Sequence, residues 1–241
     1  MVEAVALAAG LVAYNNLFNL LPQRARDRLY VPLHLGLTLL LLAWARYVVG
    51  LDLEALGLGA GEAGASALRQ AQASALWGLG IAVALVASLF LLVAFPRLLP
   101  RRLEDPRLRG VTTGEVVYRA LVRIPIGTAL FEEVAFRSVL YGLMLERWDA
   151  ATALWGSSLA FALWHVMPTR EVVGKVGMAR GPLLLALALV GGVAATYLGG
   201  ILLGLLRQET GSVAGCVVAH AVINSLALVA ARWRSVRQGA G

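Results

Sequence analysis

The chain has 241 residues, of which 59% are hydrophobic and only 15% are charged, and its formal net charge is +7. Soluble domains contain about a quarter charged residues, so this composition excludes an ordinary soluble protein and predicts an all-α, polytopic membrane protein. The basic residues lie in short segments between apolar runs, which favours charges that orient helices in a bilayer over a nucleic-acid-binding surface. The single cysteine, Cys216, excludes an intrachain disulfide and a multi-cysteine metal site.

Seven apolar runs are long enough to cross a bilayer as helices, which takes roughly 20 residues. The fourth run is too long for one straight crossing and contains Pro125 and Gly127, so we expect residues 112–124 to form a separate interfacial helix that ends there. The sequence thus predicts a transmembrane bundle of seven to eight helices. In chain order the runs lie at 3–21, 30–50, 74–95, 115–145, 150–167, 182–206 and 212–231.

The loops between these runs alternate in charge. Segments 22–29, 97–110 and 168–181 and the end of the chain at 232–241 are rich in arginine, whereas the loops between them are acidic or neutral. Because basic loops stay on the cytoplasmic side, seven crossings predict an N-terminus outside the cell and a cytoplasmic C-terminus, in the cytoplasmic membrane.

Few ionisable side chains fall deep inside the predicted spans. An ionised group at bilayer depth costs at least ~2.5–3.5 kcal/mol on insertion scales, so such groups face the protein interior and are functional by default. His34 stands near the start of the second span, where we expect it to be interfacial. The deep set consists of Glu132, Glu133, Arg137, His165 and His220, together with the amide of Asn224.

The spacing of the acidic pair separates its two members. Glu133 and Arg137 are four residues apart, so they lie one turn apart on the same helix face and can form an ion pair. The Glu133–Arg137 pair could serve only to neutralise two buried charges, or it could belong to a functional site. Glu132 lies about 100° round the helix from Glu133 and has no local partner.

The histidines lie on later helices. Phe161 precedes His165 by four residues, so its ring can pack against the imidazole. His220 and Asn224 have the same spacing and present an imidazole and an amide from one face of the last span. We therefore expect three helices to direct Glu132, His165 and the His220–Asn224 pair at one cavity.

These groups suit the hydrolysis of a peptide bond. A buried carboxylate can act as the general base that activates water, with a histidine sharing that work. An amide and a second imidazole can donate hydrogen bonds to the developing oxyanion. The same residues support an alternative, because two histidines and a glutamate (Glu132, His165 and His220) leave an open position on zinc. Taken singly, each buried group has a structural explanation, but together their insertion costs favour a functional polar cavity.

Three motifs resemble those of a known family. The sequence E-E-V-A-F-R at 132–137 resembles the E-E-x-x-x-R motif of the CPBP intramembrane proteases, the CAAX-protease and bacteriocin-processing (Abi) family. F-A-L-W-H at 161–165 and H-A-V-I-N at 220–224 resemble its F-x-x-x-H and H-x-x-x-N motifs, and all three stand in the family order.

The resemblance covers roughly 115–231 and divides the chain into three parts. It predicts a catalytic core at 111–231. Residues 1–110 would form supporting transmembrane helices and loops, and residues 232–241 a basic cytoplasmic tail.

The resemblance implies an intramembrane endopeptidase that cleaves a membrane-embedded or lipid-anchored protein or peptide. The family includes the endopeptidase that removes the last three residues of prenylated CAAX proteins. By the same resemblance, Glu132 and His165 would activate water, and His220 and Asn224 would stabilise the oxyanion. No cofactor is expected under a glutamate-dependent mechanism, although the family has also been called a metalloprotease group. The supporting positions would be Glu133, Arg137 and Phe161.

The residues disfavour two other classes of intramembrane protease. The zinc signature H-E-x-x-H is missing, because Val166 follows His165 and Ala221 follows His220. The Gly-Ser-Ser segment at 156–158 does not match the G-x-S-G arrangement of rhomboid-like serine proteases. A proton- or ion-coupled transporter and a non-catalytic membrane scaffold or immunity protein are the alternative functions, and no inverted repeat supports the transporter.

Overall fold

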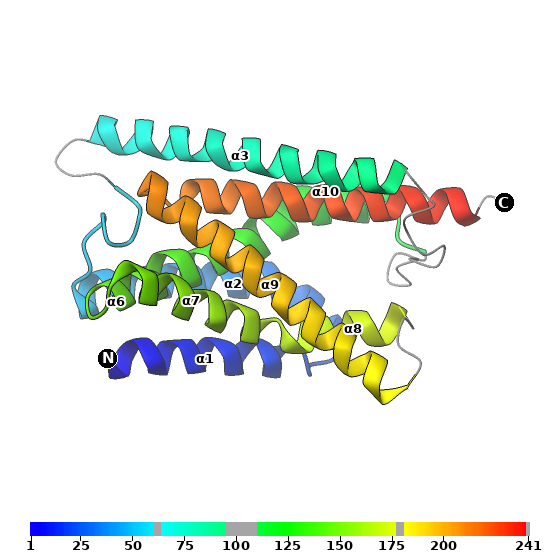
Figure 1. Cartoon of the computed structure of the whole chain (residues 1–241), viewed down its shortest axis with the longest axis horizontal. Coiled ribbons are helices and arrows are strands. Elements are labelled where there is room, and N and C mark those ends of the chain that lie inside the picture. The colour runs from blue at the N-terminus through cyan, green and yellow to red at the C-terminus, as the bar shows by residue number, and fades with distance from the viewer. Residues whose placement is uncertain (60–63, 95–109, 177–180, 240–241) are drawn as a thin grey trace.

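The computed structural model describes residues 1–59, 64–94, 110–176 and 181–239. Within these ranges the elements in chain order are α1 (Val2–Phe18), α2 (Gln23–Ala43), the π-helix η1 (Trp44–Val49), α3 (Gly64–Ala94), α4 (Thr113–Tyr118), the π-helix η3 (Arg119–Leu130), α5 (Phe131–Glu133), the π-helix η4 (Val134–Leu140), α6 (Tyr141–Leu145), α7 (Ala150–Trp164), α8 (Val166–Val176), α9 (Pro182–Thr210) and α10 (Ala214–Gly239). The elements from α4 to α6 follow one another without interruption and form one long helix. The predicted all-α bundle of seven to eight helices is therefore confirmed for the described part of the chain (Figure 1).

Several helices have the length and apolarity of membrane spans. Among the described residues, α7 and α8 would together form a fifth span, although they meet at a bend of 42°. α1 is apolar but shorter, with 17 residues. The chain is an integral, multi-pass membrane protein, while its orientation in the bilayer stays a prediction. The four helices that meet the criteria alone are Gln23–Val49, Ser66–Ala87, Pro182–Thr210 and Ala214–Trp233.

Helices begin earlier than the apolar runs do. α2 begins at Gln23 and α3 at Gly64, whereas the apolar runs begin at 30 and 74. α8 likewise occupies part of a segment that was expected to be a loop, and α10 continues to Gly239. Ala, Arg, Gln and Leu fill the first turns of α2 and α3 and are good helix formers. Apolarity therefore marks the embedded part of each helix and not its ends.

Polar caps set where the two central helices begin. The hydroxyl of Thr112 accepts a hydrogen bond from the Glu115 N–H at 3.2 Å, at the start of α4. The carboxylate of Asp149 accepts one from the Thr152 N–H at 2.8 Å, at the start of α7. Such caps satisfy backbone donors that have no partner inside the helix, so they fix the residues at which the motif-bearing helices enter the bundle.

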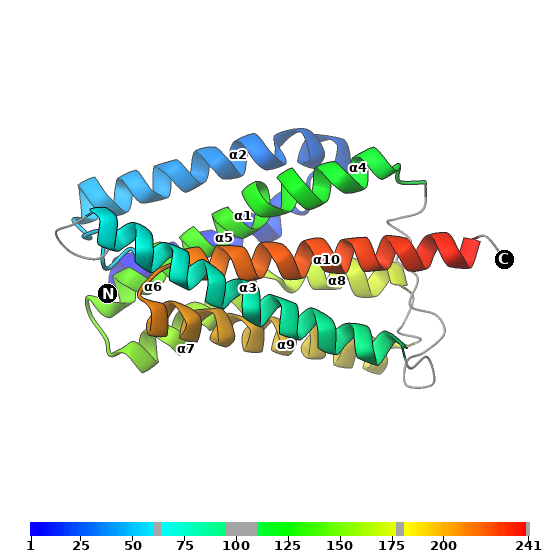
Figure 2. The same cartoon turned by 90° about the horizontal axis from the view of Figure 1, so that it is seen from above.

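α3 and α10 lie side by side and run in the same direction, and α9 crosses the bundle obliquely (Figures 1 and 2). Their close approach requires glycine at two positions, because a Cβ atom at Gly78 or Gly215 would overlap the backbone of the opposite helix. The Gly215 N–H also donates to Ser74 Oγ at 2.9 Å. This contact anchors the beginning of α10, which carries the third motif.

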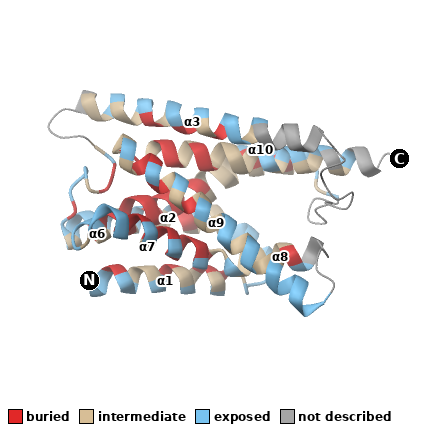
Figure 3. Cartoon of the chain, viewed as in Figure 1, coloured by how far each residue is buried: buried red, intermediate tan, exposed pale blue. Residues whose placement is uncertain are grey.

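The core lies along the middle of the long helix (Figure 3). Every residue of 131–143 is buried, and a helix that is buried on all sides is the centre of a bundle. Phe161 and Trp164 of α7 pack against it. By contrast, α9 exposes large apolar side chains such as Leu187 and Val190, as expected of a surface that faces lipid.

The break predicted near Pro125 is wrong. The chain stays helical through this residue, in π-helical register over Arg119–Leu130, so residues 112–124 are not a separate helix. In that register the N–H of residue 125 would bond to the carbonyl of Ala120, and proline has no N–H. Ser225 Oγ of α10 donates to that carbonyl at 2.8 Å. A neighbouring helix thus supplies the hydrogen bond that the proline cannot make.

Candidate functional site

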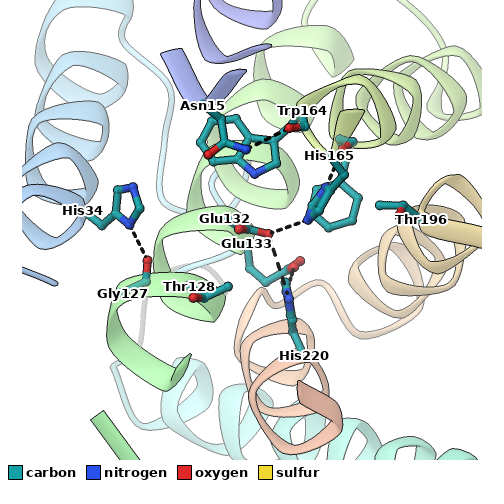
Figure 4. Close-up of polar contacts among 12 residues, drawn as sticks. Asn15, His34, Gly127, Thr128, Glu132, Glu133, Trp164, His165, Thr196 and His220 are labelled. Carbon is teal, nitrogen blue, oxygen red and sulfur yellow. Dashed lines mark hydrogen bonds and ion pairs between the residues drawn. The ribbon is translucent and has the colours of Figure 1, made fainter. Parts of the chain in front are cut away.

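Two adjacent carboxylates lie on α5, in the middle of the buried long helix (Figure 4). The side chains of Glu132 and Glu133 are only 6% and 0% exposed. Because neighbouring residues on a helix point about 100° apart, the two carboxylates have different surroundings.

The Glu133 carboxylate has two charged or polar partners. Its Oε1 accepts hydrogen bonds from His220 Nδ1 at 2.7 Å and from Arg137 Nη1 at 3.3 Å. The Arg137 guanidinium also donates to the Gly200 carbonyl at 3.2 Å and lies 4.0 Å from the centre of the Phe161 ring. A buried ion pair is tolerated when both charges are paired and hydrogen-bonded. This network pairs both charges, although Glu133 Oε2 and Arg137 Nε are buried without a hydrogen-bond partner among the described residues. The predicted ion pair is confirmed, and the bond to His220 is an addition that the sequence did not predict.

Glu132 faces two imidazoles. Its Oε2 lies 3.6 Å from His165 Nε2 and 3.9 Å from His220 Nε2. This oxygen is buried and has no hydrogen-bond partner among the described residues. The separations exceed those of direct hydrogen bonds and leave room for a bridging water or substrate oxygen. The three predicted groups, from three separate helices, therefore meet at one point.

His165 lies at a bend and not inside a straight span. α7 ends at Trp164 and α8 begins at Val166, and the two helices are bent by 42°. Pro168 explains the bend, because it has no N–H to bond to the carbonyl of Trp164 four residues earlier. The span expected at 150–167 therefore bends in its last turn.

Two asparagines of α1 hold this bend. Asn15 Nδ2 donates to the carbonyl of Trp164 at 2.8 Å (Figure 4). Asn16 Nδ2 donates to the Leu163 carbonyl at 3.1 Å, and its Oδ1 accepts a hydrogen bond from the Met167 N–H at 2.9 Å. Side-chain amides thus replace backbone hydrogen bonds on both sides of the bend. Neither asparagine was predicted from the sequence, because no pattern in α1 marks them.

Phe161 orients the ring of His165. His165 Nδ1 lies 2.8 Å from the Phe161 carbonyl, and the two rings meet edge to face with their centroids 4.5 Å apart. A carbonyl only accepts hydrogen bonds, so Nδ1 carries a proton, and Nε2 lies on the side of Glu132. The predicted packing of Phe161 on His165 is confirmed.

A cavity of about 800 Å³ connects these groups to the end of the bundle. Glu132, His165 and Asn224 line it, and its walls come from α1, α2, η3, α8 and α10. Its volume lies within the range of pockets that bind small-molecule ligands. Asn224, the fourth residue predicted for the site, therefore lines the same cavity as Glu132 and His165. His220 does not line this cavity but lies beside Glu132, which does.

An aromatic cluster lies behind the acidic pair. His34 Nδ1 donates to the Gly127 carbonyl at 2.7 Å (Figure 4). Its ring stacks on Phe131 with centroids 4.6 Å apart. Tyr14 adds an edge contact at 5.9 Å. His34 is buried among side chains of the protein, and its expected place at the membrane interface stays a prediction. Its aromatic partners from the neighbouring helices enclose it.

The side chains of Glu132, His165 and His220 are not spaced as metal ligands in this structure. Within the described ranges, no group of three His, Cys, Asp or Glu side chains is placed to hold a metal ion. The Nδ1 atoms of both histidines are bonded to a carbonyl or a carboxylate, which leaves each Nε2 on the side of Glu132. A reaction without a metal ion stays a prediction.

The fold and the site define a multi-pass helical membrane protein with a buried carboxylate–imidazole cluster. Residues 113–226 match the family model described as Type II CAAX prenyl endopeptidase Rce1-like. This range contains all three motifs, so the match supports the CPBP, or CAAX-protease, family that the motifs predicted. The family is one of intramembrane endopeptidases that act on membrane-associated proteins. No curated protein and no solved structure matches the chain.

Proposed function

We propose that the protein is an intramembrane endopeptidase that hydrolyses a peptide bond of a membrane-associated protein or peptide, with water activated by Glu132 and His165. The proposal depends on one observation. Oε2 of Glu132 is buried without a hydrogen-bond partner among the described residues and lies 3.6 Å from His165 Nε2, beside a cavity. Buried polar atoms are normally hydrogen-bonded, so this open acceptor beside an imidazole is a site for a water molecule.

The reaction needs one proton acceptor that later acts as a donor. A water held by Glu132 and His165 Nε2 attacks the carbonyl carbon of the substrate, and its proton passes to the Glu132 carboxylate. The new C–O bond converts the carbonyl oxygen into an oxyanion. Glu132 then returns the proton to the amide nitrogen, the C–N bond breaks, and a carboxylic acid and an amine are released.

His220 and Asn224 are suited to stabilise the oxyanion. His220 Nδ1 is bonded to Glu133, so a doubly protonated ring, balanced by that carboxylate, would present Nε2–H beside Glu132. Asn224 lies one turn further along α10 and lines the same cavity, so its amide supplies a second donor. Removing one donor of this kind typically lowers kcat by about 10²–10³-fold.

The test is cleavage of a defined peptide by the purified protein in lipid nanodiscs. The probe is a farnesylated peptide that ends in a CAAX sequence, and release of the C-terminal fragment is followed by mass spectrometry. Loss of the general base should make Glu132→Gln slower by about 10²–10⁴-fold in kcat. Glu146→Gln is the matched control, because Glu146 is exposed beyond α6, and it should keep full activity. Full activity in a folded Glu132→Gln protein would remove Glu132 as the base.

A second experiment searches for the natural substrate. Membrane peptides are compared between cells that carry the wild-type protein and cells that carry Glu132→Gln. Peptides that accumulate only with the variant are the expected result. If no peptide differs and the probe is not cleaved, the endopeptidase proposal is contradicted.

A further inference from the structure

A series of hydrogen bonds along the cavity wall leads from α8 to the bend at His165. Glu171 Oε2 of α8 accepts a hydrogen bond from Arg26 Nη1 of α2 at 3.2 Å. The same Nη1 donates to Asn19 Oδ1, at the end of α1, at 3.0 Å. Asn19 Nδ2 in turn donates to Asn15, at 2.8 Å to its carbonyl and at 3.1 Å to its Oδ1. The four side chains all line the cavity.

The series begins on one side of the bend and ends on the other. Asn15 Nδ2 donates to the carbonyl of Trp164, the last residue of α7, at 2.8 Å (Figure 4). Glu171 lies on the second turn of α8, beyond the bend. We call Asn15, Asn19, Arg26 and Glu171 the bend network, because these side chains of α1, α2 and α8 connect the two helices that meet at His165.

The bend network connects a partly exposed ion pair to a buried amide. The side chains of Arg26 and Glu171 are 16% and 29% exposed, whereas Asn15 is buried. An exposed ion pair alone contributes little to stability, but hydrogen bonds in series polarise one another and are stronger in the low-dielectric interior. Arg26 makes both of its bonds through Nη1, and its Nε is buried without a hydrogen-bond partner among the described residues. The pair can therefore affect the bend only through Asn19 and through α8 itself.

A second ion pair at the same end of the cavity offers an internal comparison. Arg123 Nη1 of η3 donates to Asp27 at 2.7 Å, and the two side chains are 22% and 38% exposed. Asp27 follows Arg26 directly on α2, and it also lines the cavity. Its side chain bonds to η3 and, within the described ranges, to no member of the bend network. The two pairs are thus alike in place and exposure but differ in their connection to His165.

We propose that three residues of the bend network position His165 for catalysis, by holding α8 at the angle that keeps the imidazole beside Glu132. The positioning residues are Asn19, Arg26 and Glu171. This inference rests on the proposed function, because it assigns His165 to the activation of water. The three residues act through the bend: when one bond is lost, α8 changes its angle and His165 Nε2 leaves its place 3.6 Å from Glu132 Oε2. Turnover then falls while substrate binding is kept.

The first experiment cuts the bend network at a single position. Asn19→Asp keeps an acceptor for Arg26 but has no N–H to donate to Asn15, so it separates the ion pair from the bend. With the farnesylated peptide in nanodiscs, kcat should fall about three- to tenfold, because one hydrogen bond no longer holds a catalytic group in place, and KM should not change. An unchanged kcat in the folded variant would overturn the proposal.

The ion pair is tested from both sides. Glu171→Met and Arg26→Met should each lower kcat by a similar factor, whereas Arg26→Lys keeps a charge that can donate to both partners and should retain most of the activity. Asp27→Leu is the matched control and should have the kcat of the wild type. If it is slowed as much as Glu171→Met, the effect comes from charge at the cavity and the proposal is overturned. A rise in KM alone would place these residues in substrate binding and overturn it as well.

The second experiment follows the bend without catalysis. Spin labels are attached to Leu159→Cys on α7 and Gly174→Cys on α8, since both positions are exposed and the cysteine already in the chain is buried. The wild-type background should give one narrow distribution of label distances. Asn19→Asp and Glu171→Met should broaden it, and Asp27→Leu should not. An unchanged distribution in a variant with lowered kcat would show that the residue does not act through the bend.

The two experiments also separate this inference from the proposed function. Glu132-dependent cleavage that no variant of the bend network slows would overturn the positioning role and leave the endopeptidase intact. A broadened distribution in those variants, with no cleavage of the peptide by the wild type, would overturn the endopeptidase and leave the control of the bend intact.

Discussion

His220 joins the two adjacent glutamates: its Nδ1 lies 2.7 Å from Glu133 Oε1, and its Nε2 lies 3.9 Å from Glu132 Oε2. The His220 ring therefore contacts both carboxylates, but the two carboxylates have different roles. Glu133, together with Arg137, orients the imidazole, while Glu132 remains open to the cavity. Two acidic residues in a row are explained by this division, because a single carboxylate could not both hold the histidine and accept a proton from water.

This division predicts opposite effects on stability. Glu133→Gln leaves the Arg137 guanidinium buried without its counter-charge, so the variant should lose about 3–5 kcal/mol of unfolding free energy. Glu132→Gln removes a carboxylate that has no hydrogen-bonded counter-charge, so it should be at least as stable as the wild type. Reversible unfolding in detergent measures both. Equal losses in the two variants would contradict the division.

A double variant tests whether the buried pair contributes net stability. Replacing both members by apolar residues of similar volume, Glu133→Leu with Arg137→Met, removes both desolvation costs. The double variant should be more stable than either single variant, although it should be inactive because His220 loses its support. If the double variant is less stable than both single variants, the pair does not behave as one unit.

The asparagines of α1 should affect turnover more than binding. Replacing Asn15 and Asn16 by leucine removes the hydrogen bonds at the bend that carries His165, so the imidazole loses its position. A small displacement of a catalytic group can cost about 10²-fold in rate, so we expect kcat to fall while KM changes little. Gln72→Leu, on an exposed position of α3, is the control for losing an amide.

A selective rise in KM for the asparagine variant would place these residues in substrate binding and not in positioning. An unchanged kcat would show that the bend holds without them.

The hydrogen bond from Ser225 to the Ala120 carbonyl should contribute more to the unfolding free energy when Pro125 is present than when residue 125 is alanine. Ser225→Ala leaves the Ala120 carbonyl without its partner, which should cost about 1–3 kcal/mol. Pro125→Ala restores a backbone N–H that can bond to that carbonyl, so Ser225→Ala should cost less in this background. The double-mutant cycle measures the coupling in unfolding free energy. Strict additivity would contradict the compensation.

Activity should survive removal of metal ions. The proposed reaction activates water with Glu132 and His165 and uses no metal ion, so dialysis against a strong chelator should leave kcat within error, and elemental analysis should find no stoichiometric zinc. Loss of activity that added zinc restores would overturn the metal-free mechanism.

The sequence predicted that the side chains of the three motifs meet at one place. Glu132, His165 and His220 lie in three separate apolar runs, and the cost of burying them predicts that they meet. The bond between Glu133 and His220 was not predictable, since helical spacing describes contacts within one helix and not between helices 87 residues apart.

Prolines were the least reliable guide to the fold. Pro125 predicted a break that does not occur, because Ser225 of another helix supplies the missing hydrogen bond. Pro168 was not used to predict a bend, although its missing N–H explains the one at His165 through the carbonyl four residues earlier. In both helices a side chain of another helix bonds to the freed carbonyl, Ser225 to that of Ala120 and Asn15 to that of Trp164, so the local sequence shows neither partner.

The contact between Asn16 and the bend has a consequence for biosynthesis. α1 is translated before the bend that it secures and before α10, the helix that brings the second imidazole. The two imidazoles therefore cannot meet Glu132 until α10 has been made, and under the proposed function the nascent chain is inert toward neighbouring membrane proteins up to that point.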